Sequence, residues 1–209
     1  MTISYPLALP TVTGFAQVEL RAINAVARGQ SPFTFASQVY RYPGQMWQAD
    51  VSLPPMSRER AEVWIGWILS LEGQFGNFLL GDPLGKIPRG VAAQFPGTPL
   101  VKGDGQTGQT LNIDGASAGK TGWLKAGDYI QIGAGASARL HKALQDVNTD
   151  ETGNATLSLW PRVRIAPADN TPITLSNPQG VFRLSSNEQA WSINEASIYG
   201  VTFGAEEVI

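Results

Sequence analysis

The chain has 209 residues, of which 43% are hydrophobic and only 15% are charged, with a formal net charge of −2. A slightly acidic chain without any run of lysine or arginine lacks the electrostatic footprint of a specific nucleic-acid-binding protein. The absence of cysteine excludes disulfides and thiolate metal sites. No apolar run approaches the ~20 residues that a membrane helix needs. The first ten residues contain two prolines and no basic residue, unlike a signal peptide, so we expect synthesis in the cytoplasm without membrane insertion.

The first quarter of the chain alternates apolar and polar residues, which predicts β-strands. Residues 15–27 are typical of a first strand. Residues 33–53 are typical of a hairpin that turns at Pro43-Gly44 and buries one face. The clearest period of two predicts that four side chains on that face are buried: Trp47, Ala49, Val51 and Leu53.

Residues from about 57 to 73 form the only segment with a clear helical period. Ser57 is suited to the N-cap and Gly73 to the C-terminal stop. Spacings of three and four predict a core-facing stripe made of Ala61, Trp64, Ile65, Ile68, Leu71 and Phe75. Val63 and Trp67 widen the apolar face beyond that stripe, which makes them candidates for a subunit contact.

Turn residues dominate the middle of the chain and separate short apolar segments. This spacing predicts a small β-barrel or sandwich with strands near residues 110–113, 128–132, 138–146, 155–159 and 163–165. From Gly180 to Phe203 the alternation matches that of the N-terminal part. We therefore predict a mainly β fold: a β-sandwich from residues 1–95 plus 179–209 with one flanking helix, and a small β-barrel domain inserted at 96–178.

No segment carries a convincing catalytic, metal-binding or cofactor-binding motif. Gly103–Gly108 matches a dinucleotide fingerprint and Gly115–Thr121 resembles a phosphate-binding loop, but neither precedes a helix, so both predict loops. His141 is the only histidine, and we expect it at a surface or cross-strand position. Glu206-Glu207 are expected at a solvated end. Because no segment supplies the groups of an assembled catalytic site, we predict neither an enzyme nor a bound metal or cofactor.

Trp123 and Trp160 leave two interpretations open. Exposed indole rings could stack on sugars, which would make the inserted domain a carbohydrate-binding adhesion module. The alternative is that both side chains belong to the core of a small β domain, since tryptophan is mostly buried on average.

Several segments together carry a resemblance to a known family. A hairpin ends in Pro54-Pro-Met-Ser57 and leads into the amphipathic helix; Asn77–Pro83, a β insertion and the strand pair Trp191 to Phe203 follow. This arrangement resembles the distal tail proteins and related minor tail proteins of long-tailed bacteriophages.

The resemblance implies a structural role and no catalytic residues. In that family a tail-tube-like β-sandwich with a flanking helix assembles into a ring, and a second β domain projects outward. By resemblance we expect a homohexameric ring at the virion tail tip, made in the cytoplasm of the host bacterium. It would join the tail-tube protein to the tip hub protein, with a lumen for the tape-measure protein and later for DNA. A near-neutral lumen would suit the passage of DNA, because basic groups would bind its phosphates.

Overall fold

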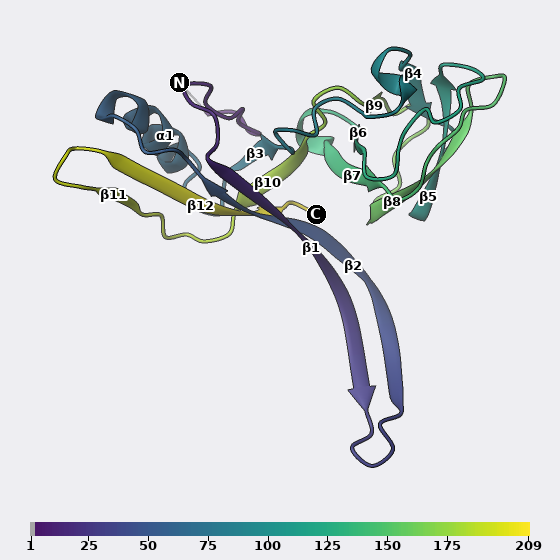
Figure 1. Cartoon of the computed structure of the whole chain (residues 1–209), viewed down its shortest axis with the longest axis horizontal. Helices are drawn as coiled ribbons and strands as arrows, with labels where there is room; N and C mark the ends of the chain where they lie inside the picture. The colour runs from purple at the N-terminus through teal and green to yellow at the C-terminus, as the bar shows by residue number, and fades with distance from the viewer. Residues whose placement is uncertain (1–2) are drawn as a thin grey trace.

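A computed structural model describes residues 3–209 as two antiparallel β-sheets and one α-helix (Figure 1). The predicted mainly β fold with one flanking helix and a small barrel-like sheet is confirmed. In this described range, no helix has both the length and the apolar character needed to cross a membrane.

The first sheet combines both ends of the chain. Its strand order is β1-β2-β12-β10-β3, and β11 pairs with the first part of β12. These strands span Gln17–Gln30 (β1), Ser37–Ser52 (β2), Tyr199–Glu207 (β12), Gly180–Leu184 (β10), Asn77–Leu80 (β3) and Trp191–Ile193 (β11). The predicted inward face is buried at all four positions: Trp47, Ala49, Val51 and Leu53.

The helix α1 (Arg58–Ser70) covers one face of this sheet and packs against β12. Five residues of the predicted stripe are buried: Ala61, Trp64, Ile65, Ile68 and Leu71. Trp64 also donates from Nε1 to Thr13 Oγ1 at 3.0 Å, and this hydrogen bond links the N-terminal segment to the helix. Ser57 stands at the N-cap in an extended conformation, without a side-chain capping bond.

Phe75 departs from the predicted stripe and is 75% exposed. The chain leaves the helix at Leu71, because Glu72 and Gly73 both have positive φ angles and Gly76 N bonds back to Leu71 O at 2.7 Å. A residue beyond this stop no longer follows the helical period, so Phe75 turns outward and meets only the edge of Tyr5 among the aromatic rings.

The second sheet is formed by the chain between β3 and β10. Its order is β4-β5-β8-β7-β6-β9, and a bridge between Leu100 and Pro172 brings the two outer strands together, so that the sheet nearly closes on itself. The strands span Gly97–Val101 (β4), Gly108–Ala116 (β5), Ala155–Val163 (β8), Arg139–Ala143 (β7), Tyr129–Ile132 (β6) and Ile173–Thr174 (β9). Two short 3-10 helices, η1 (Val91–Ala93) and η2 (Gly135–Ser137), complete it, and its interior forms a second hydrophobic core.

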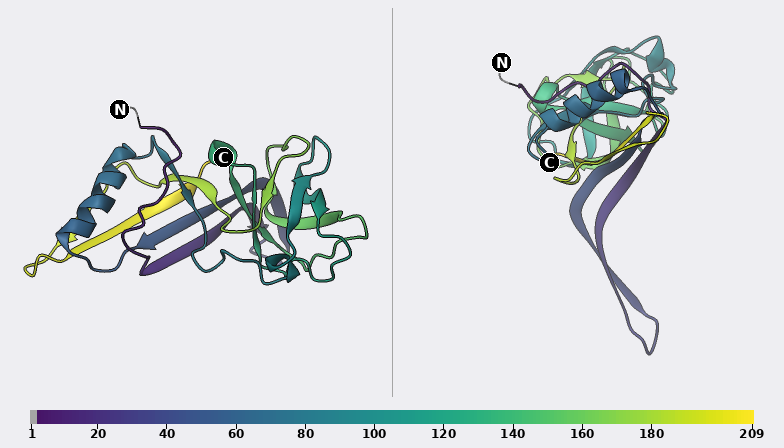
Figure 2. Two further views of the ribbon diagram at one scale, coloured as in Figure 1. Left: turned by 90° about the horizontal axis from the view of Figure 1, so that it is seen from above. Right: turned by 90° about the vertical axis from the view of Figure 1, so that its left-hand side faces the viewer.

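The strands β1 and β2 form one hairpin much longer than predicted, and its far half projects away from both sheets (Figures 1 and 2). The predicted turn at Pro43-Gly44 was wrong. These residues lie inside β2 at a register shift, opposite Ala25, and the chain turns between Ser31 and Ala36. Proline cannot donate a ladder bond and is tolerated at a bulge, so a Pro-Gly pair can mark an irregular strand instead of a turn.

Candidate assembly surface

The projecting half of the hairpin, residues 21–44, is here called the outer arm. Every residue in it except Ser31 is exposed on both faces of the ribbon. The sequence predicted one buried face along the whole hairpin. That prediction was wrong for the outer arm and holds only from Trp47 toward Leu53. Alternation shows that a strand has two chemically different faces, but nothing in residues 3–209 covers either face here. Seven large apolar side chains are consequently exposed: Ile23, Val26, Phe33, Phe35, Val39, Tyr40 and Tyr42.

The tip of the outer arm holds two phenylalanines away from the body. Phe33 is 91% exposed and Phe35 is 73% exposed. The turn that carries them is ordered by Ser31, whose amide donates to Ala36 O at 2.9 Å and whose Oγ accepts from Thr34 N at 3.3 Å. Phe35 has φ of +56°, a conformation that costs free energy for a bulky residue. The tip is therefore a defined structure that presents aromatic rings to solvent.

The register places apolar and basic groups on the same face of the outer arm. Val26 pairs with Arg41, and Arg28 pairs with Val39, so these four side chains face the same side. The third arginine, Arg21, forms a salt bridge with Asp50. No aspartate or glutamate occurs between residues 21 and 44. The arm thus offers a surface that is apolar and positively charged.

Both edges of the outer arm carry unpaired backbone groups. The strand β2 pairs with β12 only from Gln48 to Ser52, and β1 is the outermost strand of its sheet. A two-stranded ribbon alone is at best marginally stable in water, and a long, exposed apolar edge is a template for pairing with another chain. This combination is the strongest indication of a protein-binding surface in the described residues.

The root of the arm is held firmly by the second sheet. Asn24 Oδ1 accepts from Gln45 Nε2 and from Trp160 Nε1, each at 2.9 Å. Trp47 donates from Nε1 to Leu140 O at 3.0 Å, and its ring meets that of Trp160 edge to face at 4.3 Å. These contacts fix the direction in which the arm leaves the body.

A buried ion pair completes this root. Glu207 was expected to be solvated, but it is only 3% exposed and binds Arg164, with Nη2 to Oε1 at 2.5 Å. Its Oε2 accepts from the amide of Trp47 at 3.0 Å, while Arg164 also donates to Gln45 O. The pair therefore joins the end of β12, the segment after β8 and the arm. The expectation failed because Arg164 lies 43 positions away in the sequence.

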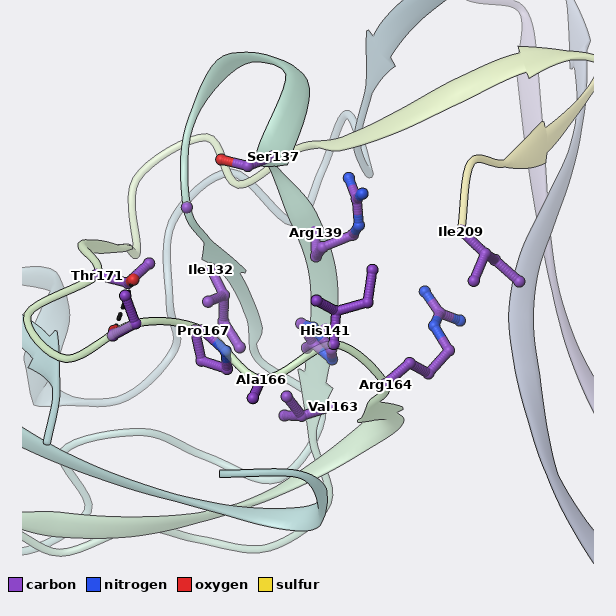
Figure 3. A pocket seen from close by; sticks show the side chains of 13 residues that line it. Ile132, Ser137, Arg139, His141, Val163, Arg164, Ala166, Pro167, Thr171 and Ile209 are labelled. Carbon is purple, nitrogen blue, oxygen red and sulfur yellow. Dashed lines mark hydrogen bonds between the residues drawn. The ribbon is translucent and has the colours of Figure 1, made fainter. Parts of the chain in front are cut away.

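A small cavity of about 220 Å³ lies beside the root, between β7 and the segment 163–171 (Figure 3). Figure 3 shows Ile132, Ala166 and Pro167 along one side and Arg139, Arg164 and Ile209 along the other. Its described lining contains no aspartate or glutamate. In the part of the chain that the structure describes, no cluster of three acidic or histidine side chains could hold a metal ion.

His141 borders this cavity and is buried, not at the surface. It lies in β7 across from Ile130 of β6, and its Nδ1 is 2.7 Å from Pro161 O. A carbonyl only accepts, so Nδ1 carries the proton and the neutral ring is the form that fits. Burial lowers the pKa of His141 to about 4, the Pro161 carbonyl opposes this shift, and Arg164 and Arg139 add to it. The ring is a structural hydrogen-bond donor at neutral pH.

The other sequence-predicted sites fall in different places. Trp123 is fully buried in the second core and donates to Phe95 O at 3.1 Å, so its ring cannot stack on a sugar. Trp160 is partly buried at the arm root. Trp67 donates to Ala8 O at 2.9 Å and packs on Phe78, so its indole is engaged inside the chain, whereas Val63 is 45% exposed on α1.

Sequence reasoning did not anticipate the outer arm or its root. One signal was available for the arm: Val39 and Tyr40 are adjacent, so both faces of the strand carry a large apolar side chain, unlike the faces of a half-buried strand. No local signal marks the root, because Asn24, Gln45, Trp160, Arg164 and Glu207 come from four separate segments.

Compared with known protein families and with curated proteins, this sequence matches none.

Proposed function

We propose that this protein is a structural subunit of a bacteriophage tail tip, where copies assemble into a ring that joins the tail-tube protein to the tip hub protein. The observation that carries the assembly role is the outer arm, a rigidly rooted ribbon with exposed aromatic residues and two unpaired edges. The phage assignment rests on the family resemblance. It is supported by a helix that packs on a β-sheet built from both ends of the chain, with a second sheet inserted between its strands.

The shape of the subunit is compatible with a closed ring. If the projecting arm docks on a different surface of the next copy, each copy can use its arm on one neighbour and receive an arm from the other. Such heterologous contacts close into rings when the rotation between copies is fixed. The hydrogen bonds at Asn24, Gln45 and Trp47 fix the arm direction, as closure requires.

The test is the mass of the assembled protein with and without the outer arm. Because Asn24 and Gln45 are cross-strand partners, residues 25–44 can be replaced by Asn-Gly, which forms a two-residue hairpin turn. The full-length chain should sediment as a ring, and the shortened chain as a folded monomer that still unfolds cooperatively.

A parallel test asks whether the protein is part of a phage. Mass spectrometry of purified particles should find it in the tail, and cryo-electron microscopy should place it at the tip. A chain that stays monomeric at high concentration and is missing from particles would refute the proposal.

A further inference from the structure

The segment between β10 and β12, residues 185–198, is here called the acceptor segment. It carries β11 and is exposed along nearly its whole length. Trp191, Ile193 and Ile198 are exposed apolar side chains within it. It also contains Glu188 and Glu195, and no lysine or arginine occurs from residue 184 to residue 209. The acceptor segment is therefore apolar and negatively charged, the complement of the outer arm.

The acceptor segment has the backbone features of a docking site. In the described structure β11 pairs only with β12, so its other edge offers unpaired amide and carbonyl groups. Gln74 anchors the start of the segment, since its amide donates to Asn187 Oδ1 and its side chain donates to Ser185 O, each at 3.0 Å. An edge that is held in place needs little ordering when a strand adds to it.

A groove runs between the acceptor segment and the first sheet. Its volume is about 310 Å³, and its lining includes Asp50, Ser52, Ser185, Glu188 and Thr202. Asp50 and Glu188 place carboxylates along it, although Asp50 is already paired with Arg21. Glu188 therefore supplies the negative charge of the groove, since Asp50 is neutralised by Arg21.

We propose that the outer arm of one copy docks head to tail on the acceptor segment of a second copy, with Arg28 and Arg41 facing Glu188 and Glu195. This inference rests on the proposed ring assembly and names the two surfaces that would form it. The outer arm cannot reach the acceptor segment of its own copy. It leaves the middle of the molecule, whereas β11 lies below α1 at the left-hand end in Figure 1 (see also Figure 2).

The dimensions suit contact between neighbours. From Asn24 to Gln30 the arm extends seven residues of β-strand, which at the rise of a β-strand is about 20 Å before the turn. Pairing would cover the apolar side chains on both surfaces and satisfy the open edges of β1 or β2 and β11. Oppositely charged surfaces also steer the encounter and fix its register.

Charge reversal tests this contact with the full chain. Reversing the arm, Arg28→Glu with Arg41→Glu, should weaken self-association at least tenfold in sedimentation velocity. Reversing the acceptor, Glu188→Arg with Glu195→Arg, should do the same. A one-to-one mixture of the two variants should assemble again, because each arm then meets an oppositely charged acceptor segment. The matched control for the arm reversal, Lys86→Glu with Lys102→Glu, makes the same change in charge at exposed positions outside both surfaces.

Disulfide trapping gives a second measurement, since the natural chain has no cysteine. Val39→Cys combined with Ile193→Cys should give cross-linked ladders of copies under mild oxidation, whereas Lys102→Cys combined with Ile193→Cys should not.

The outcomes separate this inference from the proposed function. Self-association of the natural chain that is unchanged by arm reversal, or not restored by mixing, would overturn the head-to-tail contact while leaving a ring intact. A natural chain that never self-associates would overturn both.

Discussion

The ion pair at the arm root allows a quantitative test of how the two sheets are joined. The Glu207 side chain has no exposed surface and that of Arg164 is 13% exposed. Replacing Arg164 by methionine keeps the apolar length of the side chain but leaves Glu207 buried without its charged partner. Breaking a buried pair in this way costs about 3–5 kcal/mol. For a protein of about this size, each kcal/mol lowers the melting temperature by about 2–4 °C, so we expect a decrease of about 6–20 °C.

The assay is urea denaturation of the natural chain and three variants: Arg164→Met, Glu207→Leu and the double variant. The double variant should recover much of the loss, because replacing both partners removes the unpaired charge. Arg58→Met provides the control, since its pair with Glu62 is exposed and contributes less than about 1 kcal/mol. A loss below about 1 kcal/mol in Arg164→Met would refute the view that this pair fastens the sheets together.

Three further predictions concern the two cores. The unfolded chain binds a proton at histidine below pH 6.5, whereas His141 in the folded chain binds one only near its pKa of about 4. The free energy of unfolding should therefore fall by about 3 kcal/mol as the pH drops from 6.5 to 4. The variant His141→Gln should flatten this slope in urea titrations at several pH values. Trp64→Ala should cost about 3–5 kcal/mol, because the side chain is fully buried, and an unchanged melting temperature would contradict its place in the core; Val63→Ala is the matched control and should change stability by less than about 0.5 kcal/mol. Trp123→Ala should cost about 3–5 kcal/mol in thermal denaturation, and a stable variant that loses only glycan binding would restore the carbohydrate interpretation.

Local periodicity predicted what depends on local structure. The helical stripe from Ala61 to Leu71 and the alternation from Trp47 to Leu53 each have one face against a core, and both were found buried. Phe75 shows the limit of this reasoning, because two residues with positive φ end the helix before the stripe does.

The outer arm and its root could not be predicted in the same way. The apolar residues of the outer arm look like core residues in the sequence, since composition does not reveal whether anything covers them. Glu207 looks like a solvated terminal residue until Arg164 is placed beside it. Burial of a charge depends on partners that only the folded chain brings together.

The outer arm contributes almost nothing to the stability of its own subunit, because its side chains contact solvent beyond the root. Substitutions at Val39 or Tyr40 should therefore leave the purified subunit folded, soluble and normal in any melting experiment. Their effects would emerge only when copies meet. If copies assemble through the outer arm as proposed, selection on this ribbon would act through the assembly alone, and its sequence could change together with a neighbouring surface without passing through a misfolded subunit.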